Sequence, residues 1–126
     1  MMFKNILLVG LGGGIGSIAR YVCQKYIHEW HPHPFPMGTF FVNILGCFLI
    51  GLFYSISEKG NIMTPEWRIL LTTGLCGGFT TFSTFSFENI QLLKAGDFSY
   101  FILYIAGSIL LGIGATYLGM LTIKLI

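Results

Sequence analysis

The chain has 126 residues, of which 54% are hydrophobic and only 10% are charged. Soluble domains carry about 25% charged residues, so this composition is typical of a membrane protein. The net charge of +2 is too small, and the seven basic residues are too scattered, for a nucleic-acid-binding surface. The three cysteines form no C-x-x-C pair, and no catalytic triad, metal motif or phosphate-binding loop indicates an enzyme.

Four apolar segments follow one another along the chain, over residues 3–27, 37–57, 67–93 and 98–124. About 20 apolar helical residues cross the hydrocarbon core of a bilayer. We therefore expect a single all-α transmembrane domain over residues 1–126, with four spanning helices in the cell (inner) membrane.

Four such spans place the basic residues almost evenly on the two sides of the membrane. One side holds four of them, Lys4, Lys59, Arg68 and Lys124, and the other holds three, Arg20, Lys25 and Lys94. Loop Lys and Arg residues set the orientation of a membrane protein. With so little bias the chain is expected to insert both ways, and opposite copies to pair as an antiparallel two-fold homodimer.

The first segment contains two G-x-x-x-G spacings, from Gly10 to Gly14 and from Gly12 to Gly16, which allow close helix packing. Arg20 lies near the end of this segment, where it either anchors the helix at the interface or attracts an anion at a vestibule. The following loop contains three histidines, but it offers no fourth ligand and is rich in proline. We interpret it as a solvated loop rather than a metal site.

The third segment carries glycines and hydroxyls where a passive span would carry apolar side chains. Gly74, Gly77 and Gly78 lie near its centre, and each weakens a helix by roughly 1 kcal/mol relative to alanine. We therefore expect the helix to break at these glycines. Irregular backbone at membrane depth persists only where it is buried in protein, lines a wet cavity or binds an ion. We therefore expect the functional site of the protein to lie at this helix break.

Neutral donors and aromatic rings gather just after the glycines. Five hydroxyls within seven residues alternate with phenylalanines, of which Phe82 and Phe85 share one helix face. Phenyl rings have positive edges, and several weak contacts allow an ion to leave as well as to bind. Ser83 and Thr84 would help to replace the water of such an ion. Glu88, one turn later, either bonds pore hydroxyls or marks the membrane edge.

Polar residues in two other segments fit the same site. Asn43, the one amide of the second segment, either cross-links helices or presents its NH₂ group to an anion, and beside the third segment we favour the pore. In the fourth segment Tyr104, Ser108, Gly112 and Thr116 follow one helix face, as a polar track or as small-residue packing. The residues alone indicate a path for an anion or small polar solute.

Three stretches of this sequence resemble the Fluc/CrcB family of fluoride channels. Residues 13–21 read GGIGSIARY, residues 38–46 read GTFFVNILG, and residues 77–86 read GGFTTFSTFS. The match covers all four segments in order. The resemblance implies a passive, fluoride-selective channel that relieves cytoplasmic fluoride toxicity, built as an antiparallel dual-topology homodimer with two pores.

The resemblance also implies roles for individual residues. Phe82 and Phe85 would be ring-edge ligands of fluoride, Asn43 and Ser108 hydrogen-bond donors along the path, and Tyr104 and Thr116 part of the polar track. The backbone carbonyls of Gly77 and Thr80 from both subunits would hold a central structural sodium ion. Gly112 departs from a position that carries a hydroxyl in many relatives.

Two other classes of function are open to a chain of this kind. A small proton-coupled multidrug exporter needs a carboxylate deep in the membrane, and Glu88 is the one acidic residue near a span interior. An accessory membrane subunit would turn the Thr/Ser/Phe run toward a partner protein.

Overall fold

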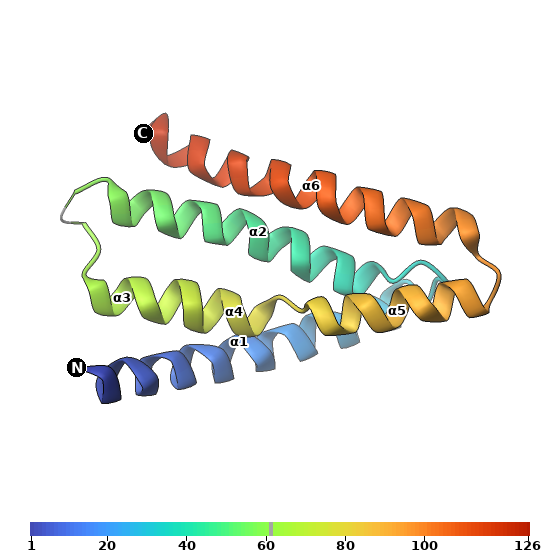
Figure 1. The fold of residues 1–126 in the computed structure, drawn as a ribbon, viewed down its shortest axis with the longest axis horizontal. Helices are drawn as coiled ribbons and strands as arrows, with labels where there is room; N and C mark the ends of the chain where they lie inside the picture. The colour runs from blue at the N-terminus through green and yellow to red at the C-terminus, as the bar shows by residue number, and fades with distance from the viewer. Residues whose placement is uncertain (61) are drawn as a thin grey trace.

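The computed structural model describes residues 1–60 and 62–126, and within them all regular structure is helical (Figure 1). Three uninterrupted helices are long and apolar enough to cross a membrane: α1 (Met2–Trp30), α2 (Met37–Glu58) and α6 (Phe98–Lys124). Each coincides with an expected apolar segment to within three residues. Both chain termini lie at the same end of the molecule in Figure 1.

The third apolar segment is a succession of shorter helices. It consists of α3 (Pro65–Ile69), the π-helical turn η1 (Leu70–Cys76), α4 (Gly77–Phe79) and α5 (Phe82–Lys94). Figure 1 shows them end to end beside the long helices, from green α3 to orange α5. Single π-helical turns are rare and occur often at functional sites.

Local sequence accounts for most of the helix ends. His31 follows α1 with a non-helical backbone, with φ of −134° and ψ of 72°, and it precedes a proline, which disfavours the helical conformation. The Thr64 side chain accepts a hydrogen bond from the Trp67 N–H and so caps α3, whose first residue is Pro65. Gly96, with φ of +79°, turns the chain from α5 toward α6.

The break in the third segment lies at Thr80 and Thr81, so the expectation that it falls at the glycines was wrong. Gly74, Gly77 and Gly78 are all helical, whereas Thr80 and Thr81 have extended backbone with ψ of 158° and 115°. The glycines serve packing instead. A Cβ atom at Gly78 would lie 2.9 Å from the Cα of Gly13 on α1, so the missing side chain permits this contact.

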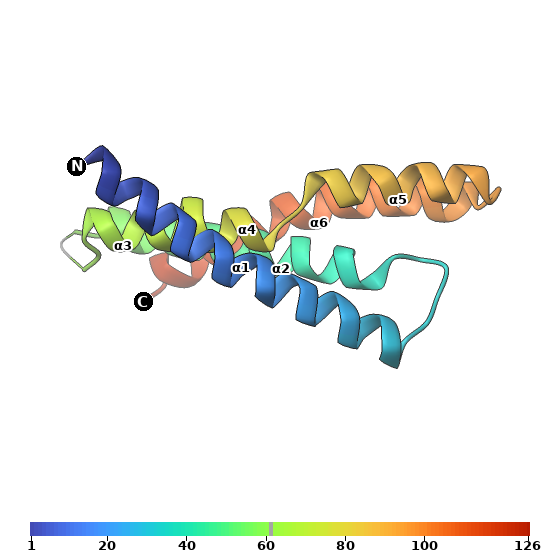
Figure 2. The same ribbon diagram turned by 90° about the horizontal axis from the view of Figure 1, so that it is seen from below.

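The break allows the third segment to change its packing partner. Before it, η1 and α4 pack along α1, and after it α5 packs along α6. Figure 2 shows this exchange, with α4 crossing α1 and α5 running beside α6. The two long helices α2 and α6 share the most extensive interface of the molecule.

Only one of the two G-x-x-x-G pairs in α1 makes a close contact. A Cβ atom at Gly12 would lie 2.8 Å from the Leu75 backbone nitrogen, and one at Gly16 would lie 2.9 Å from that of Phe79. At Gly10 and Gly14, no atom of another described element lies within 4 Å of that position. Gly12 and Gly16 are therefore the residues that seat α1 against η1 and α4.

The apolar core is small and aromatic. Tyr104 is fully buried and packs with Phe35 and Leu92, and four partly buried rings surround them, those of Phe40, Phe85, Tyr100 and Phe101. Large apolar side chains cover much of the outer surface of α1 and α6. Such a surface suits a lipid environment rather than water.

We predict that Gly12→Ala destabilises the fold, whereas Gly14→Ala does not. The added methyl group at Gly12 meets backbone atoms of η1, which can move only by separating the helices, and overpacking of this kind costs about 1–3 kcal/mol. The midpoint of thermal unfolding in detergent measures the difference. Equal midpoints for the two variants would contradict the assignment of the α1 contact.

Candidate functional site

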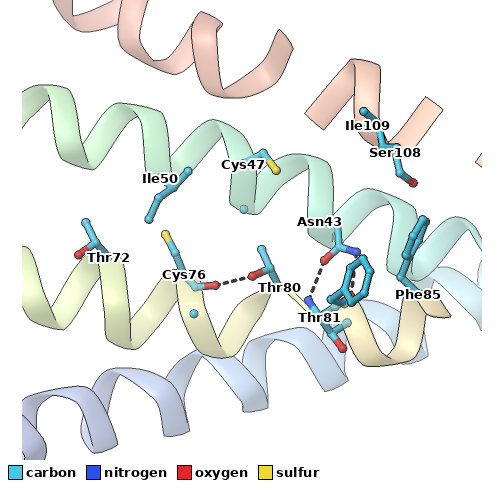
Figure 3. A pocket seen from close by; sticks show the side chains of 13 residues that line it. Asn43, Cys47, Ile50, Thr72, Cys76, Thr80, Thr81, Phe85, Ser108 and Ile109 are labelled. Atoms are coloured by element: carbon cyan, nitrogen blue, oxygen red, sulfur yellow. Dashed lines mark hydrogen bonds between the residues drawn. The ribbon is translucent and has the colours of Figure 1, made fainter. Parts of the chain in front are cut away.

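A pocket of about 400 Å³ opens beside the break in the third segment (Figure 3). Its lining comes from α2, η1, α4, the break, α5 and α6, and includes Asn43, Gly77, Thr80, Thr81, Phe82, Phe85 and Ser108. The structure thus brings together six of the residues expected at the site, and adds Thr81 to them. None of the described side chains that line this pocket is charged.

Asn43 holds the break together from α2. Its Nδ2 donates to the Thr81 carbonyl at 3.1 Å, and its Oδ1 accepts from the Thr81 N–H at 2.8 Å, as Figure 3 shows. The amide therefore replaces the hydrogen bonds that the helix loses at this residue. Asn43 thus cross-links α2 to the third segment, as one of its two interpretations states. The second N–H of the amide donates no hydrogen bond within the described residues.

The same arrangement takes the usual helical donors away from two carbonyl groups. In a continuous helix, Gly77 O would accept from the Thr81 N–H, which instead donates to Asn43. Thr80 O would accept from the Thr84 N–H, which donates to the Thr81 hydroxyl at 3.2 Å. Both residues line the pocket, so its lining includes two residues whose carbonyl groups lack their usual helical donors. Carbonyl oxygens of unwound helices suit Na⁺.

The phenyl rings of Phe82 and Phe85 and the hydroxyl of Ser108 belong to the lining of the pocket. The Phe82 side chain is 78% exposed, and its ring centroid lies 5.7 Å from that of Phe85. The Ser108 hydroxyl is enclosed and has no hydrogen-bond partner among the described residues. A buried polar atom without a partner is costly, so this hydroxyl can donate to a bound ion at little cost.

Four other residues expected along the path lie outside the lining of this pocket. Thr84 and Ser83 interact with the Thr81 hydroxyl, at 3.0 and 3.3 Å, and so belong to the cap of α5. Thr116 donates to the carbonyls of Cys47 and Gly112, which links α6 to α2. Tyr104 is buried in the core, behind Phe85. Contact of these four residues with an ion stays a prediction.

Gly112 interrupts the row of polar residues on α6. A Cβ atom there would lie 3.4 Å from Cys47 Sγ and 4.0 Å from Ile44 Cδ1. Both are ordinary van der Waals distances, so the packing among the described residues does not explain the glycine. Cys47, Cys76 and Thr72 also line the pocket, and no sequence pattern had indicated them.

Arg20 has a role that neither sequence interpretation anticipated. Its Nε donates to the Gly78 carbonyl at 3.1 Å, across 58 positions of the chain. This carbonyl belongs to the last turn of α4, where acceptors lack helical donors. Arg20 therefore supports the break from α1, and a positive charge suits this end of the helix.

Glu88 accepts hydrogen bonds from two hydroxyl groups that lie outside the lining of the pocket beside the break. Its carboxylate accepts from the Tyr104 hydroxyl at 2.8 Å and from the Thr39 hydroxyl at 2.9 Å. Thr39 in turn accepts from Gln24 Nε2 at 2.9 Å. Thr39 and Gln24 were missed from the sequence, although Thr39 lies one turn before Asn43 on the same helix.

We predict that Asn43→Ala loosens the break. The substitution leaves the N–H and the carbonyl of Thr81 without partners, at about 1–3 kcal/mol for each buried group. Hydrogen exchange of the peptide that covers residues 77–86 is expected to accelerate at least tenfold. Asn89→Ala is the control, because among the described residues the Asn89 side chain donates to the Phe85 carbonyl of its own helix and makes no other hydrogen bond. Equal protection of the peptide in both variants would contradict this role.

Comparison with known proteins gives consistent matches. The model of the family described as CrcB-like protein, Camphor Resistance (CrcB), matches residues 7–120. A protein of Phocaeicola vulgatus is 52% identical over 93% of this chain and 96% of its own length. Proteins of Leptospira interrogans and Flavobacterium psychrophilum are 46% and 47% identical, over 96% of this chain and 95% and 98% of their own. All three are named fluoride-specific ion channel FluC. This chain belongs to the CrcB-like family.

Proposed function

We propose that this protein is a passive, fluoride-selective channel of the cell membrane that exports fluoride from the cytoplasm, and that it is not an enzyme. The observation that carries the proposal is the pocket beside the break, which combines two phenyl rings with neutral donors and lacks a charged lining side chain. The names of the relatives support the same function. The three long apolar helices support a multi-pass membrane protein.

The proposed path uses donors that surround a small anion without holding it tightly. Phe82 and Phe85 turn positive ring edges toward fluoride, and Ser108 and the second N–H of Asn43 donate to it. Neutral ligands release the ion more readily than a buried arginine or lysine would. Chloride is larger than fluoride and fits a path with closely spaced donors less well.

A second copy of the chain completes the proposed channel. The broken third segment is taken as a fourth span, which agrees with the two termini lying at one end of the molecule (Figure 1). Phe82 is largely exposed in the single chain although it carries a proposed ligand, so a partner surface is needed to enclose the path. The nearly even distribution of Lys and Arg supports an antiparallel arrangement of the two copies.

A sodium ion at the centre of the dimer is part of the proposal. The carbonyls of Gly77 and Thr80 would hold it, and the same groups of the second copy would supply further ligands. The ion would give these carbonyls the partner that the broken helix cannot supply. The role of the ion would be structural, because it would join the broken third segments of the two subunits.

The two other functions have less support. An exporter that exchanges protons for substrate needs a carboxylate open to both, whereas Glu88 accepts hydrogen bonds from two hydroxyls and lies beside the aromatic core. An accessory subunit would not require a cluster of neutral donors around a pocket. The names of the relatives favour neither.

Fluoride efflux from liposomes that contain the purified protein tests the proposed function. A fluoride electrode follows the release, and chloride efflux is measured in parallel. We expect rapid fluoride release and negligible chloride release. A folded dimer that releases neither ion would refute the channel and favour the accessory subunit.

We predict that Phe82→Ile lowers fluoride efflux at least tenfold while the dimer stays folded, because isoleucine offers no positive ring edge. Phe87→Ile is the matched control. Phe87 is also an exposed phenylalanine of α5, but it does not line the pocket. The same efflux assay measures both variants, and similar rates in the two would remove the ring edges from the mechanism.

We predict that Gly77→Val weakens the dimer without unfolding the subunit. Within one chain, a Cβ atom at this position meets only the Thr72 carbonyl, at 4.0 Å, so any crowding arises from the second copy and the sodium ion. Light scattering in detergent measures the mass with sodium present and with sodium replaced by N-methylglucamine. The wild-type dimer is expected to dissociate without sodium, and the variant in both solutions. A stable, sodium-independent dimer in both proteins would count against the central ion.

A further inference from the structure

A second cavity, of about 200 Å³, lies between the end of α1, the loop before α2, and α5. Three exposed histidines stand at its rim, His28, His31 and His33, and the half-buried Glu88 and the buried Thr39 lie deeper. The sequence assigned these histidines to a solvated loop. The structure instead gathers them around one opening.

This cavity is one helical turn away from the proposed fluoride path. Thr39 precedes Asn43 by one turn of α2, and Glu88 follows Phe85 by one turn of α5, so the same two helices line both pockets. Tyr104 joins the two, since its hydroxyl donates to Glu88 and its ring lies 4.8 Å from that of Phe85. The cavity therefore lies on the same two helices as the proposed path, at the end where α1 and the histidine loop meet water.

The charge of the cavity depends on its histidines. The titratable side chains in its lining are the three histidines and Glu88; Tyr100 lies edge-on against His33, and Tyr104 donates to Glu88 from the core. Lys25 and Glu29, on the same part of α1, are outside the lining and have opposite charges. With neutral histidines, the carboxylate leaves a negative mouth that repels an anion.

The three histidines are not equivalent. Nδ1 of His33 accepts a hydrogen bond from the Phe35 N–H at 3.0 Å, and its ring packs against Tyr100, so His33 is tied to the loop. His28 lies in the last turn of α1 and His31 caps that helix, and the helix dipole favours a positive charge at this end. Histidine is the side chain that commonly gains its charge between pH 8 and 5.

We propose that this cavity is the mouth of the fluoride path and that the protonated imidazoles of His28 and His31 bind a small monovalent anion, fluoride, at its rim. The inference rests on the proposed channel function. Two imidazolium charges outweigh the single carboxylate charge and raise the local anion concentration at the mouth. Fluoride throughput therefore rises as the pH falls.

Fluoride currents across a planar bilayer test this proposal, because neutral HF that crosses the lipid carries no current. The readout is the ratio of the current at pH 5.5 to that at pH 7.5, in NaF solutions of low ionic strength. We expect a ratio of at least three for the wild type. It is expected to decrease when an impermeant salt raises the ionic strength, because exposed charges are screened.

Two variants test which histidines carry the charge that raises the current at low pH. The double variant His28→Gln, His31→Gln is expected to give a ratio near one, whereas His33→Gln, the matched control, keeps the wild-type ratio. A wild-type ratio near one would overturn the proposal. A high ratio that persists in the double variant would also overturn it and would assign the effect to Glu88.

A separate measurement distinguishes binding from folding effects. Addition of fluoride at pH 5.5 is expected to shift the imidazole NMR signals of His28 and His31, and not that of His33. Unshifted signals for all three would refute the anion site. The absence of any fluoride current at pH 7.5 from a folded dimer would instead refute the channel function itself.

Discussion

The two hydrogen bonds between Asn43 and the backbone of Thr81 are the interaction on which the site depends. They satisfy both polar groups of the residue at which the third segment leaves the helix. Without them, the break would expose an unpaired N–H and carbonyl at membrane depth. With them, the Gly77 carbonyl loses its helical donor; the Thr80 carbonyl loses its own to the Thr81 hydroxyl, and both become potential ligands. One side chain thus both stabilises the break and makes it chemically useful.

The break in turn determines how the helices pack. Because the backbone is extended at Thr80 and Thr81, η1 and α4 stay against α1 while α5 crosses to α6. Glycines on α1 allow the first contact, and Arg20 binds the last turn of α4. The second contact brings Phe85 and Glu88 against Tyr104. The pocket beside the break and the cavity at the histidine rim both result from this change of partner.

The two pockets differ in chemistry, and their order along α2 and α5 gives the difference a function. The inner pocket has neutral donors and ring edges, which suit passage of a small anion. The outer cavity has titratable side chains, which suit attraction from water. Tyr104 joins them, through its hydrogen bond to Glu88 in the outer cavity and its ring contact with Phe85 in the inner pocket. In the proposed channel, an ion would meet charge only where water is near, and neutral groups where the surroundings are apolar.

The sequence by itself determined the membrane class, the bounds of the long helices and the family, because apolar length and short motifs are local properties. It also identified Asn43, Phe82, Phe85 and Ser108, as polar or aromatic residues in unusual places. Only the tertiary structure decided the position of the break, the partners of Arg20 and Glu88, and the histidine rim. These depend on contacts across 38, 58 and 49 positions of the chain for Asn43, Arg20 and Glu88. Local patterns do not encode such contacts, because packing of distant helices selects which glycine, carbonyl or hydroxyl is used.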